Sequence, residues 1–487
     1  MSCFKKCLAA LLAGALSFNS FAVNVLKANT EFKKGNYAVA LPLYEEGAKL
    51  GNAHAQYQLG IMYLKGLGVE PNVASSLIYL SLAAEQRYHN AQSIIEQMRS
   101  SLDEQELSLL DNAIKEQRVV HQNYQHQFLP ELNQNNIDKK VAFDGENALT
   151  QKVYFEELVE FQNFDDDFQN SGSGLDDLDD DVSLDTAIVV SNPGFLVVEN
   201  DVACDGSVRF VREIQKSGNT RRFLDAYKLF PLGQPKLGGE STEFVHRAYL
   251  GAAVNDQFYL NDNLPQLYKE TRRVLRAAKK EPTLESLYEY AMAMIIFPWM
   301  ESEGNGAEKL LKQLAEKGHP GAMYEYGLQL YIKQKDIAEA IKWIAQASKY
   351  GLSRAEYRLG KLLLSSPWVI NDEKKALFWF ESAAQKGDEA AALHVAKIKL
   401  TTKNKTLIDV TGAIQYLDAI SSSQNLNPEY QYLLSISYRL RPQRDFKKSV
   451  ELLEKAISMG MRTNWDTSEW QALLAKMLQG NITVTDF

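Results

Sequence analysis

Histidine and acidic side chains are the residues of this sequence that could carry acid–base or metal chemistry, and they are scattered. The seven histidines stand at His54, His89, His121, His126, His246, His319 and His394. The closest pair, His121 and His126, lies five residues apart, whereas two metal ligands on one helix face need a spacing of about three or four. No His-x-x-x-His stands beside a Glu, and no phosphate-binding glycine loop is present. The sequence therefore predicts no catalytic set, no metal site and no cofactor.

Acidic residues keep one enzymatic interpretation open. A cell-envelope hydrolase would hold a pair of Asp or Glu side chains at a catalytic separation, but nothing in the sequence fixes two carboxylates in this way. Nine Asp fall between Asp165 and Asp185, with Gly and Ser among them. Their spacing lacks the glycine and the terminal Glu of an EF-hand loop. We therefore expect a solvated acidic linker there, since such a segment cannot bury enough apolar surface to order itself.

The first 22 residues have the composition of a secretory signal peptide. Two lysines precede an apolar run from Cys7 to Leu16, and Ser20 and Ala22 place small side chains where signal peptidase cleaves. We expect cleavage after Ala22; the alternatives are an uncleaved anchor and a buried helix. The signal resembles bacterial ones, which predicts a periplasmic protein with no integral membrane segment after cleavage.

Removal of this segment leaves a single cysteine, Cys204, and an acidic chain. The formal charge changes from −9 to −11, because Lys5 and Lys6 are the only charged residues that are lost. An exported chain with one cysteine has no internal disulfide, so its stability must come from packing. The negative charge argues against nucleic acid and against an anionic membrane surface as partners.

Small residues recur at intervals of 33 to 36 residues, which indicates internal repeats. Each repeat has two helices with a glycine at the joint, and these joint glycines are Gly51, Gly318, Gly351 and Gly387. Glycine tolerates the left-handed conformation that ends a helix. Inside the helices, Gly60 and Gly360 allow two helices to approach closely. Because one hairpin cannot bury its apolar face alone, the repeats are expected to stack into arrays.

The stretch GNAHAQYQLGIMYLKGLGVEPNVASSLIYLSLAAEQ, which begins at Gly51, resembles the Sel1-like repeat, a relative of the tetratricopeptide repeat. The family pattern is present at Ala55, Leu59, Gly60, Tyr63, Gly66, Gly68, Val69, Ala83 and Ala84. KALFWFESAAQKGDEAAA, from Lys375, matches the second helix and the joint. The resemblance implies stacked helical hairpins that serve as an adaptor for a peptide or a domain, without catalysis. We expect the aromatic residues Trp343, Trp368, Phe378 and Trp379 to lie in the core.

The pattern changes to strands after the acidic segment. GFLVVENDVACDGSVRFVREIQKSG, from Gly194, alternates apolar and polar residues around Asp205-Gly206, which is typical of a β-hairpin. NTRRFLDAYKLFPLG then predicts a short helix that ends near Pro231, and Glu243 to Gly251 predicts a third strand. The expected order is strand, strand, helix, strand.

This stretch resembles the C-terminal domain of TonB, the energy transducer that contacts outer-membrane receptors. The matching positions are Gly194, Asp205, Gly206, Val208, Ser217, Gly218, Phe223, Ala226, Phe230, Pro231 and Phe244 to Tyr249. Phe and Pro are adjacent here instead of one residue apart, and the family's Tyr-Pro before the first helix is not evident. The resemblance implies that an exposed edge strand binds an extended peptide by strand addition. The contact residues would be Val245, Arg247 and Tyr249; the alternative is a small α+β domain that only spaces two arrays.

Together these patterns predict a mainly α protein in which two α-solenoid arrays of helical hairpins flank a small α+β domain with a short antiparallel sheet. The predicted boundaries are a signal peptide at 1–22, an N-terminal repeat array with a capping helix at 23–130, a linker at 131–187 that is acidic and disordered in 163–185, a TonB-like domain at 188–255 and a C-terminal repeat array at 256–480. The predicted function is a periplasmic, non-enzymatic scaffold for proteins or peptides. Outer-membrane receptors and TonB-dependent transport are the partners and process that the TonB resemblance suggests, and the hydrolase is the alternative.

Overall fold

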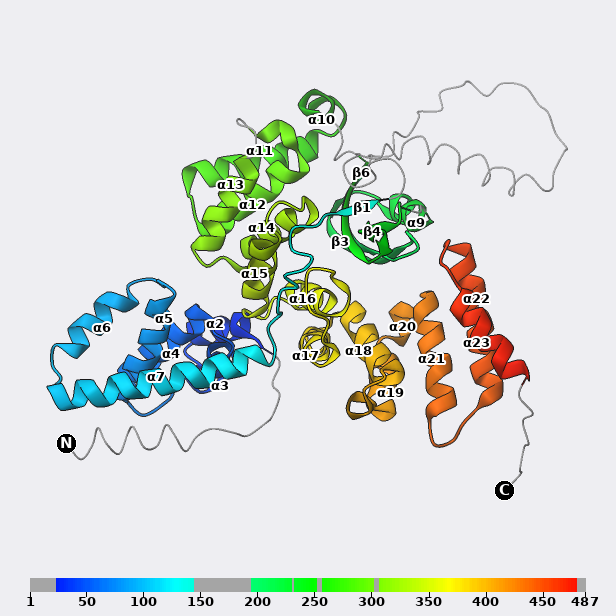
Figure 1. Ribbon diagram of the computed structural model, residues 1–487. Coiled ribbons are helices and arrows are strands. Elements are labelled where there is room, and N and C mark those ends of the chain that lie inside the picture. Colours follow the sequence, from blue (N-terminus) through cyan, green and yellow to red (C-terminus); the bar gives the residue numbers. More distant parts are fainter. Residues whose placement is uncertain (1–22, 144–193, 230–231, 252–255, 302–305, 480–487) are drawn as a thin grey trace. The chain divides into compact units, whose positions relative to one another are not determined.

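The computed structural model describes residues 23–143, 194–229, 232–251, 256–301 and 306–479 (Figure 1). The expected signal peptide and the acidic segment 163–185 lie outside these residues. The chain forms two compact units, and each combines segments that are far apart in the sequence. The first unit contains Met1–Ile137 and Ala315–Leu452, and the second contains Asp138–Leu314 and Leu453–Phe487. The segment expected as one C-terminal array is thus divided between them, and the domain boundaries drawn from the sequence stay predictions.

The first unit is built from helical hairpins, as the sequence predicts. Its N-terminal part contains α2 (Val25–Lys33), α3 (Tyr37–Lys49), α4 (Ala53–Lys65), α5 (Val73–Glu85), α6 (Ala91–Arg99) and α7 (Glu104–His126). Its C-terminal part contains α14 (Pro320–Ile332), α15 (Ile337–Ser348), α16 (Ser353–Ser365), α17 (Glu373–Ala384), α18 (Glu389–Thr401), η3 (Lys405–Leu407), α19 (Val410–Ala419), α20 (Ser421–Gln424) and α21 (Pro428–Leu440). The helix α22 (Phe446–Arg462) begins in the first unit and ends in the second.

The joints between hairpins use glycine in the left-handed conformation, which confirms their predicted role. Gly51, Gly318, Gly351 and Gly387 have φ angles of 78°, 90°, 84° and 88°. The next residue is the N-cap of a helix in every case. The side chains of Asn52, His319 and Asp388 accept a hydrogen bond from a backbone amide of the first turn. One short segment therefore ends one helix and begins the next, which fixes the repeat length.

Glycines inside the first helix of a hairpin let the second helix approach closely. A Cβ atom on Gly60 would lie 2.5 Å from Leu80 Cγ, and one on Gly360 would lie 2.7 Å from Phe380 Cε1. On Gly327 it would lie 2.9 Å from the Ala340 carbonyl oxygen. Real Cβ atoms essentially never come this close to a neighbour, so only glycine fits at these crossings.

The second unit contains the small α+β domain. The strands of its main sheet and the helix α9 follow the predicted order of strand, strand, helix and strand. The hairpin strands β2 (Phe195–Val202) and β3 (Val208–Ser217) are followed by α9 (Arg221–Leu229) and β6 (Phe244–Gly251). The sheet is antiparallel with the order β3-β2-β6. Its core packs α9 against the sheet through Leu196, Val198, Val202, Val208, Ala226, Tyr227, Leu232, Ala248 and Leu250.

A second, smaller sheet was not predicted. It joins β1 (Val141–Phe143), β4 (Pro235–Leu237) and β5 (Glu240–Ser241) in the order β1-β4-β5. These strands are two or three residues long, too short to show an alternating pattern, and β1 lies in the segment expected as linker. The unit also contains α10 (Gln257–Asn263), α11 (Pro265–Lys280), α12 (Leu284–Ile296), η2 (Pro298–Met300), most of α13 (Gly306–Glu316) and α23 (Ser468–Gln479).

The helix crossings give a first prediction. Gly360→Ala should lower the free energy of unfolding by about 1–3 kcal/mol, because the new methyl group would overlap the Phe380 ring. The control is Gly306→Ala in α13, where the nearest atom lies 3.9 Å from the new Cβ; this variant should be neutral or up to about 1 kcal/mol more stable. Thermal unfolding followed by circular dichroism measures both. Equal stabilities for the two variants would contradict the close crossing.

Candidate binding surfaces

The predicted contact residues lie on β6, which is an outer strand of the three-stranded sheet. Val245, Arg247 and Tyr249 pair in register with Asp201, Glu199 and Val197 of β2. The side chains of Val245 and Arg247 are buried, and that of Tyr249 is partly buried. Arg247 forms an ion pair with Glu199, with 3.2 Å between Nη2 and Oε2. Most residues of β6 are buried with their backbone, so strand addition there would require this edge to become uncovered, and the role of the three residues in binding stays a prediction.

A buried polar trio lies on the other face of β6. The Tyr227 hydroxyl lies 2.7 Å from Asn200 Oδ1 and 2.7 Å from His246 Nδ1. Both contacts are hydrogen bonds when the Tyr227 hydroxyl donates to Asn200 Oδ1 and accepts from His246 Nδ1–H. Burial raises the pKa of the Tyr227 hydroxyl far above its usual value. The Tyr227 hydroxyl thus keeps its proton, and the trio links α9 to β2 and β6, which is a structural role.

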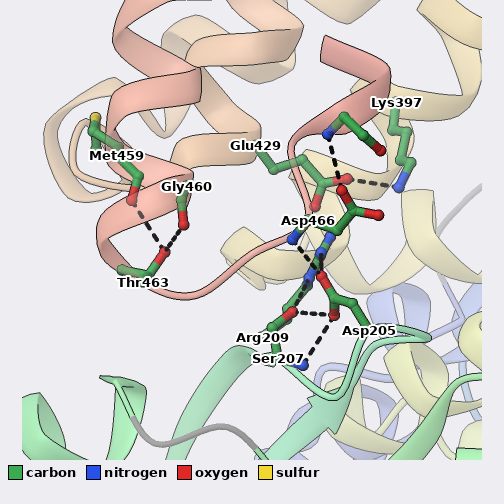
Figure 2. Close-up of polar contacts among 10 residues, drawn as sticks. Asp205, Ser207, Arg209, Lys397, Glu429, Met459, Gly460, Thr463 and Asp466 are labelled. Carbon is green, nitrogen blue, oxygen red and sulfur yellow. Dashed lines mark hydrogen bonds and ion pairs between the residues drawn. The ribbon is translucent and has the colours of Figure 1, made fainter. Parts of the chain in front are cut away.

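The turn between β2 and β3 is held by a segment about 260 residues further along the chain (Figure 2). Asp205 Oδ2 accepts a hydrogen bond from the Asp466 backbone amide at 2.7 Å. The Arg209 guanidinium lies 3.1 Å from Asp205 Oδ2 and 4.0 Å from the centre of the Trp465 ring. The Asn464 side chain donates to the Leu229 carbonyl at 3.0 Å. We call this set of contacts the clasp; it ties the loop between α22 and α23 to the α+β domain within the second unit.

The charge on Asp205 is stabilised by the clasp. Burial acts to raise the pKa of this carboxyl, but hydrogen bonds from Ser207 and from the Asp466 amide, together with the Arg209 charge, outweigh burial and lower it. At the far side of the loop, the Thr463 hydroxyl donates to the carbonyl oxygens of Met459 and Gly460, each at 3.1 Å. It thereby gives hydrogen-bond partners to carbonyl groups at the end of α22. Sequence reasoning found the Asp205-Gly206 turn but not its partner, because nothing local connects residue 205 with residue 466.

The two repeat arrays meet inside the first unit in a cluster of aromatic and polar side chains, which we call the joint. His54 Nε2 lies 2.6 Å from Asn29 Oδ1, and His54 Nδ1 lies 2.8 Å from the Tyr88 hydroxyl. The His54 ring stacks on Tyr350, with 6.0 Å between ring centres. The Leu26 amide donates to the Tyr350 carbonyl at 3.1 Å. Residues of the N-terminal hairpins therefore contact the loop between α15 and α16 directly.

The joint holds His54 in its neutral form. Because Asn29 Oδ1 can only accept, His54 donates from Nε2 and accepts from Tyr88 at Nδ1. Burial lowers the pKa of His54 to about 4, and the charges of His89 and Lys33 act in the same direction. Protonation would thus remove the acceptor that receives the Tyr88 hydroxyl.

A second connection between the arrays follows α7. That helix packs along α3 and α5, and Phe128, just after its end, packs against Phe378 of α17 with 4.1 Å between ring centres. The Trp379 indole donates to the Phe128 carbonyl at 2.7 Å. Leu132 forms a β-bridge with Val369. Trp368 and Trp379 are fully buried, as predicted, whereas Trp343 and Phe378 are only partly buried.

The described residues were also compared with the requirements of a metal site and of a membrane-crossing helix. In the part of the chain that the structure describes, no group of three or more His, Cys, Asp or Glu side chains could hold a metal ion. None of the described helices combines the length and the apolar character that a membrane-crossing segment needs. Cys204 is exposed at the β2–β3 turn.

The repeated hairpins with glycine joints define a helical-repeat fold. The model of the Sel1 repeat family matches residues 53–88, 321–351, 353–388 and 428–461, so these four segments are similar to Sel1 repeats. These segments cover the hairpins α4–α5, α14–α15, α16–α17 and α21–α22. Sel1 repeats typically serve as scaffolds for protein interactions.

Similar solved structures include a Sel1 repeat protein from Oxalobacter formigenes, which is 23% identical over 43% of this chain and 98% of its own, with a TM-score of 0.31. Another is a protective antigen present in uropathogenic Escherichia coli strains that displays an SLR fold; it is 14% identical over 95% of this chain and 91% of its own, with a TM-score of 0.34. Comparison with curated protein sequences finds no match.

The clasp gives a second prediction. Asp205→Ala removes the acceptor of the Asp466 amide and the partner of Arg209, so the 463–479 segment should exchange its amide hydrogens about 10- to 100-fold faster. Hydrogen–deuterium exchange with mass spectrometry measures this. Asp225→Ala, which removes an exposed carboxylate of α9, is the matched control. Unchanged exchange in Asp205→Ala would show that the clasp does not hold the segment.

The joint gives a third prediction, on pH. Because the pKa of His54 is about 4 in the folded chain and the ordinary pKa of a histidine is 6.5, the unfolded chain binds the proton first as the pH falls. The stabilisation is full above about pH 6.5 and is lost toward about pH 4. His54→Gln should reduce this loss by about 1–3 kcal/mol in urea unfolding across that window. The control is His126→Gln, an exposed histidine outside the joint. Parallel losses in wild type and His54→Gln would refute the assignment.

Proposed function

We propose that the protein is a non-enzymatic scaffold that binds protein or peptide partners on the Sel1 repeats of its first unit. The observation that carries this proposal is the joint. His54 and Tyr88 of one array contact Tyr350 of the other, and Phe128 adds a second connection to α17. Hairpins from residues 23–137 and 315–452 thereby form one packed unit. This unit offers a partner a larger continuous surface than either array alone. Large and continuous surfaces are what helical-repeat scaffolds use for binding.

The buried carboxylates of the first unit support a structural role over hydrolysis. Glu325, Glu356 and Glu429 are each almost fully buried, and each pairs with a cation: Arg354 at 3.0 Å, Lys386 at 2.6 Å and Lys397 at 2.6 Å, respectively. A hydrolase of the kind considered above would instead place two carboxyl groups around a substrate bond. Paired buried charges of this type hold helices in register.

The proposal places the protein in the periplasm, after export by the N-terminal signal. The basic start, the apolar run and the small residues at 20 and 22 support this location. For the α+β domain we propose the binding mode suggested by its resemblance to TonB: an extended peptide, such as a segment of an outer-membrane receptor, adds to the sheet along the β6 backbone. The antiparallel order β3-β2-β6, with β6 outermost, supports that mode.

Site-specific photo-crosslinking in the periplasm tests the scaffold proposal. A photoreactive amino acid would replace exposed residues of the first unit, namely Val73, Ile408 or Leu426, and as controls Phe258 or Leu478 of the second unit. We expect a discrete partner adduct from the first-unit positions and a weaker or different one from the controls. No adduct from any first-unit position, or the same adduct with equal yield from the control positions, would contradict the proposal. A receptor-derived peptide that crosslinks to β6 but not to the arrays would support the binding mode of the α+β domain separately.

A further inference from the structure

The backbone nitrogen of Val23 lies in a buried polar cluster of the first unit. Val23 N donates to Ser382 Oγ at 3.2 Å, although the two residues are 359 positions apart. The Ser382 hydroxyl donates to Glu356 Oε1 at 2.8 Å. Lys386 Nζ lies 2.6 Å from both oxygens of the Glu356 carboxylate and 3.0 Å from Ser382 Oγ. Val23 is 1% exposed and Glu356 is 0% exposed.

The entry of α2 into this cluster is fixed by the glycine between α15 and α16. A Cβ atom on Gly351 would lie 2.3 Å from the Val23 carbonyl oxygen, so only glycine admits Val23 at this place. Three residues later, the Leu26 amide donates to the Tyr350 carbonyl at 3.1 Å. Asn24 caps α2 by accepting from the Lys27 amide. Residue 23 therefore has a defined position at the head of α2, beside α16 and α17.

The Val23 nitrogen lies beside Ser382, which also contacts Glu356 and Lys386, and burial lowers the pKa of Lys386. Two carboxylates act in the cluster, since the Asp388 charge also acts on Glu356, while Lys386 supplies one positive charge. Burial raises the pKa of Glu356 to about 7, because the attraction of Lys386 does not fully compensate for the loss of water. An amide N–H at residue 23 contributes only a dipole, whereas an ammonium would contribute a full charge that reaches Glu356 through Ser382.

We propose that Val23 is the N-terminus of the mature protein and that its α-ammonium group is a built-in ligand of Ser382 and Glu356. The inference rests on the export step of the proposed function, in which signal peptidase hydrolyses the bond between Ala22 and Val23. Water supplies a hydroxyl to the Ala22 carbonyl carbon and a hydrogen to the Val23 nitrogen, and the new amine takes a further proton from solvent. Cleavage takes place on the unfolded chain, so the burial of Val23 in the folded protein does not obstruct it.

The consequence is a link between processing and assembly. The amide of an unprocessed chain can make the hydrogen bond to Ser382 but carries no charge. The processed chain adds a charge-assisted hydrogen bond at the contact of the N-terminal hairpins with α16 and α17. Removal of the signal peptide would therefore strengthen the attachment of one array to the other.

Three chains that differ only in the group attached to the Val23 nitrogen test the proposal in solution. The first starts at Val23 with a free amine, the second starts at Val23 with an acetylated amine, and the third keeps Phe21 and Ala22 in front. All three retain the Val23 N–H, so the comparison isolates the charge. We expect the free-amine chain to unfold on the order of 3 °C higher than the other two at pH 7.5, where Glu356 is largely ionised. Repeating all three in a Ser382→Ala background should remove most of the difference.

The pH dependence provides a readout that a purely structural effect would not give. A free α-amine has a pKa of about 7.7–8.0, so an effect of its charge on stability should be present below about pH 8 and absent at pH 10, where all three chains carry an uncharged nitrogen at residue 23. Equal unfolding midpoints at pH 7.5, or a difference that persists unchanged at pH 10, would overturn the proposal.

The position of the mature N-terminus can be measured directly on protein from cells. The intact mass of protein isolated from the periplasm should correspond to a chain that begins at Val23. A mature chain beginning at any other residue would overturn the assignment of the N-terminus. Neither result depends on partner binding, so the failure of this inference and the failure of the scaffold function are distinguishable.

Discussion

Close contact between helices at positions without a side chain is the constraint on which the first unit depends. Gly60, Gly327 and Gly360 each lie where a methyl group would overlap the second helix of the same hairpin. Such a hairpin presents an apolar face that it cannot cover, so the next hairpin must stack on it. The left-handed glycines at 51, 318, 351 and 387 set how one hairpin follows the next. Packing of this kind stabilises the first unit.

Long-range contacts then decide which hairpins share a unit. Residues 23–137 join residues 315–452 through the joint around His54 and through the contacts of Phe128 and Leu132 with the 366–379 region. In the second unit, the clasp brings residues 464–466 to the turn at Asp205. Each unit therefore consists of two segments that are far apart in the sequence. For a scaffold this matters, because the surface offered to a partner comes from both arrays.

The sequence allowed the local part of this fold to be predicted, because local patterns determine it. The spacing of Ala55, Gly60 and Gly51 reflects a helical period, and the alternation around Asp205-Gly206 reflects a strand period. These features depend on neighbours within a few residues. The joint, the clasp and the three-residue strand at Val141 were not predicted, because each depends on the choice of a distant partner. Arg247 illustrates the limit: its position on β6 could be predicted, but its burial against Glu199 requires knowledge of which strand lies beside it.

Native-state hydrogen exchange of a Gly351→Ala chain tests the central claim most directly, namely that both arrays of the first unit form one packed scaffold. This substitution places a methyl group against the Val23 carbonyl at the contact between the arrays and leaves every residue of α4 and α5 in place. If the arrays stabilise each other, amides in α4 and α5 should exchange faster, together with those of α16 and α17. Faster exchange confined to α16 and α17, with α4 and α5 unchanged, would show that the two arrays are independent and would contradict the account.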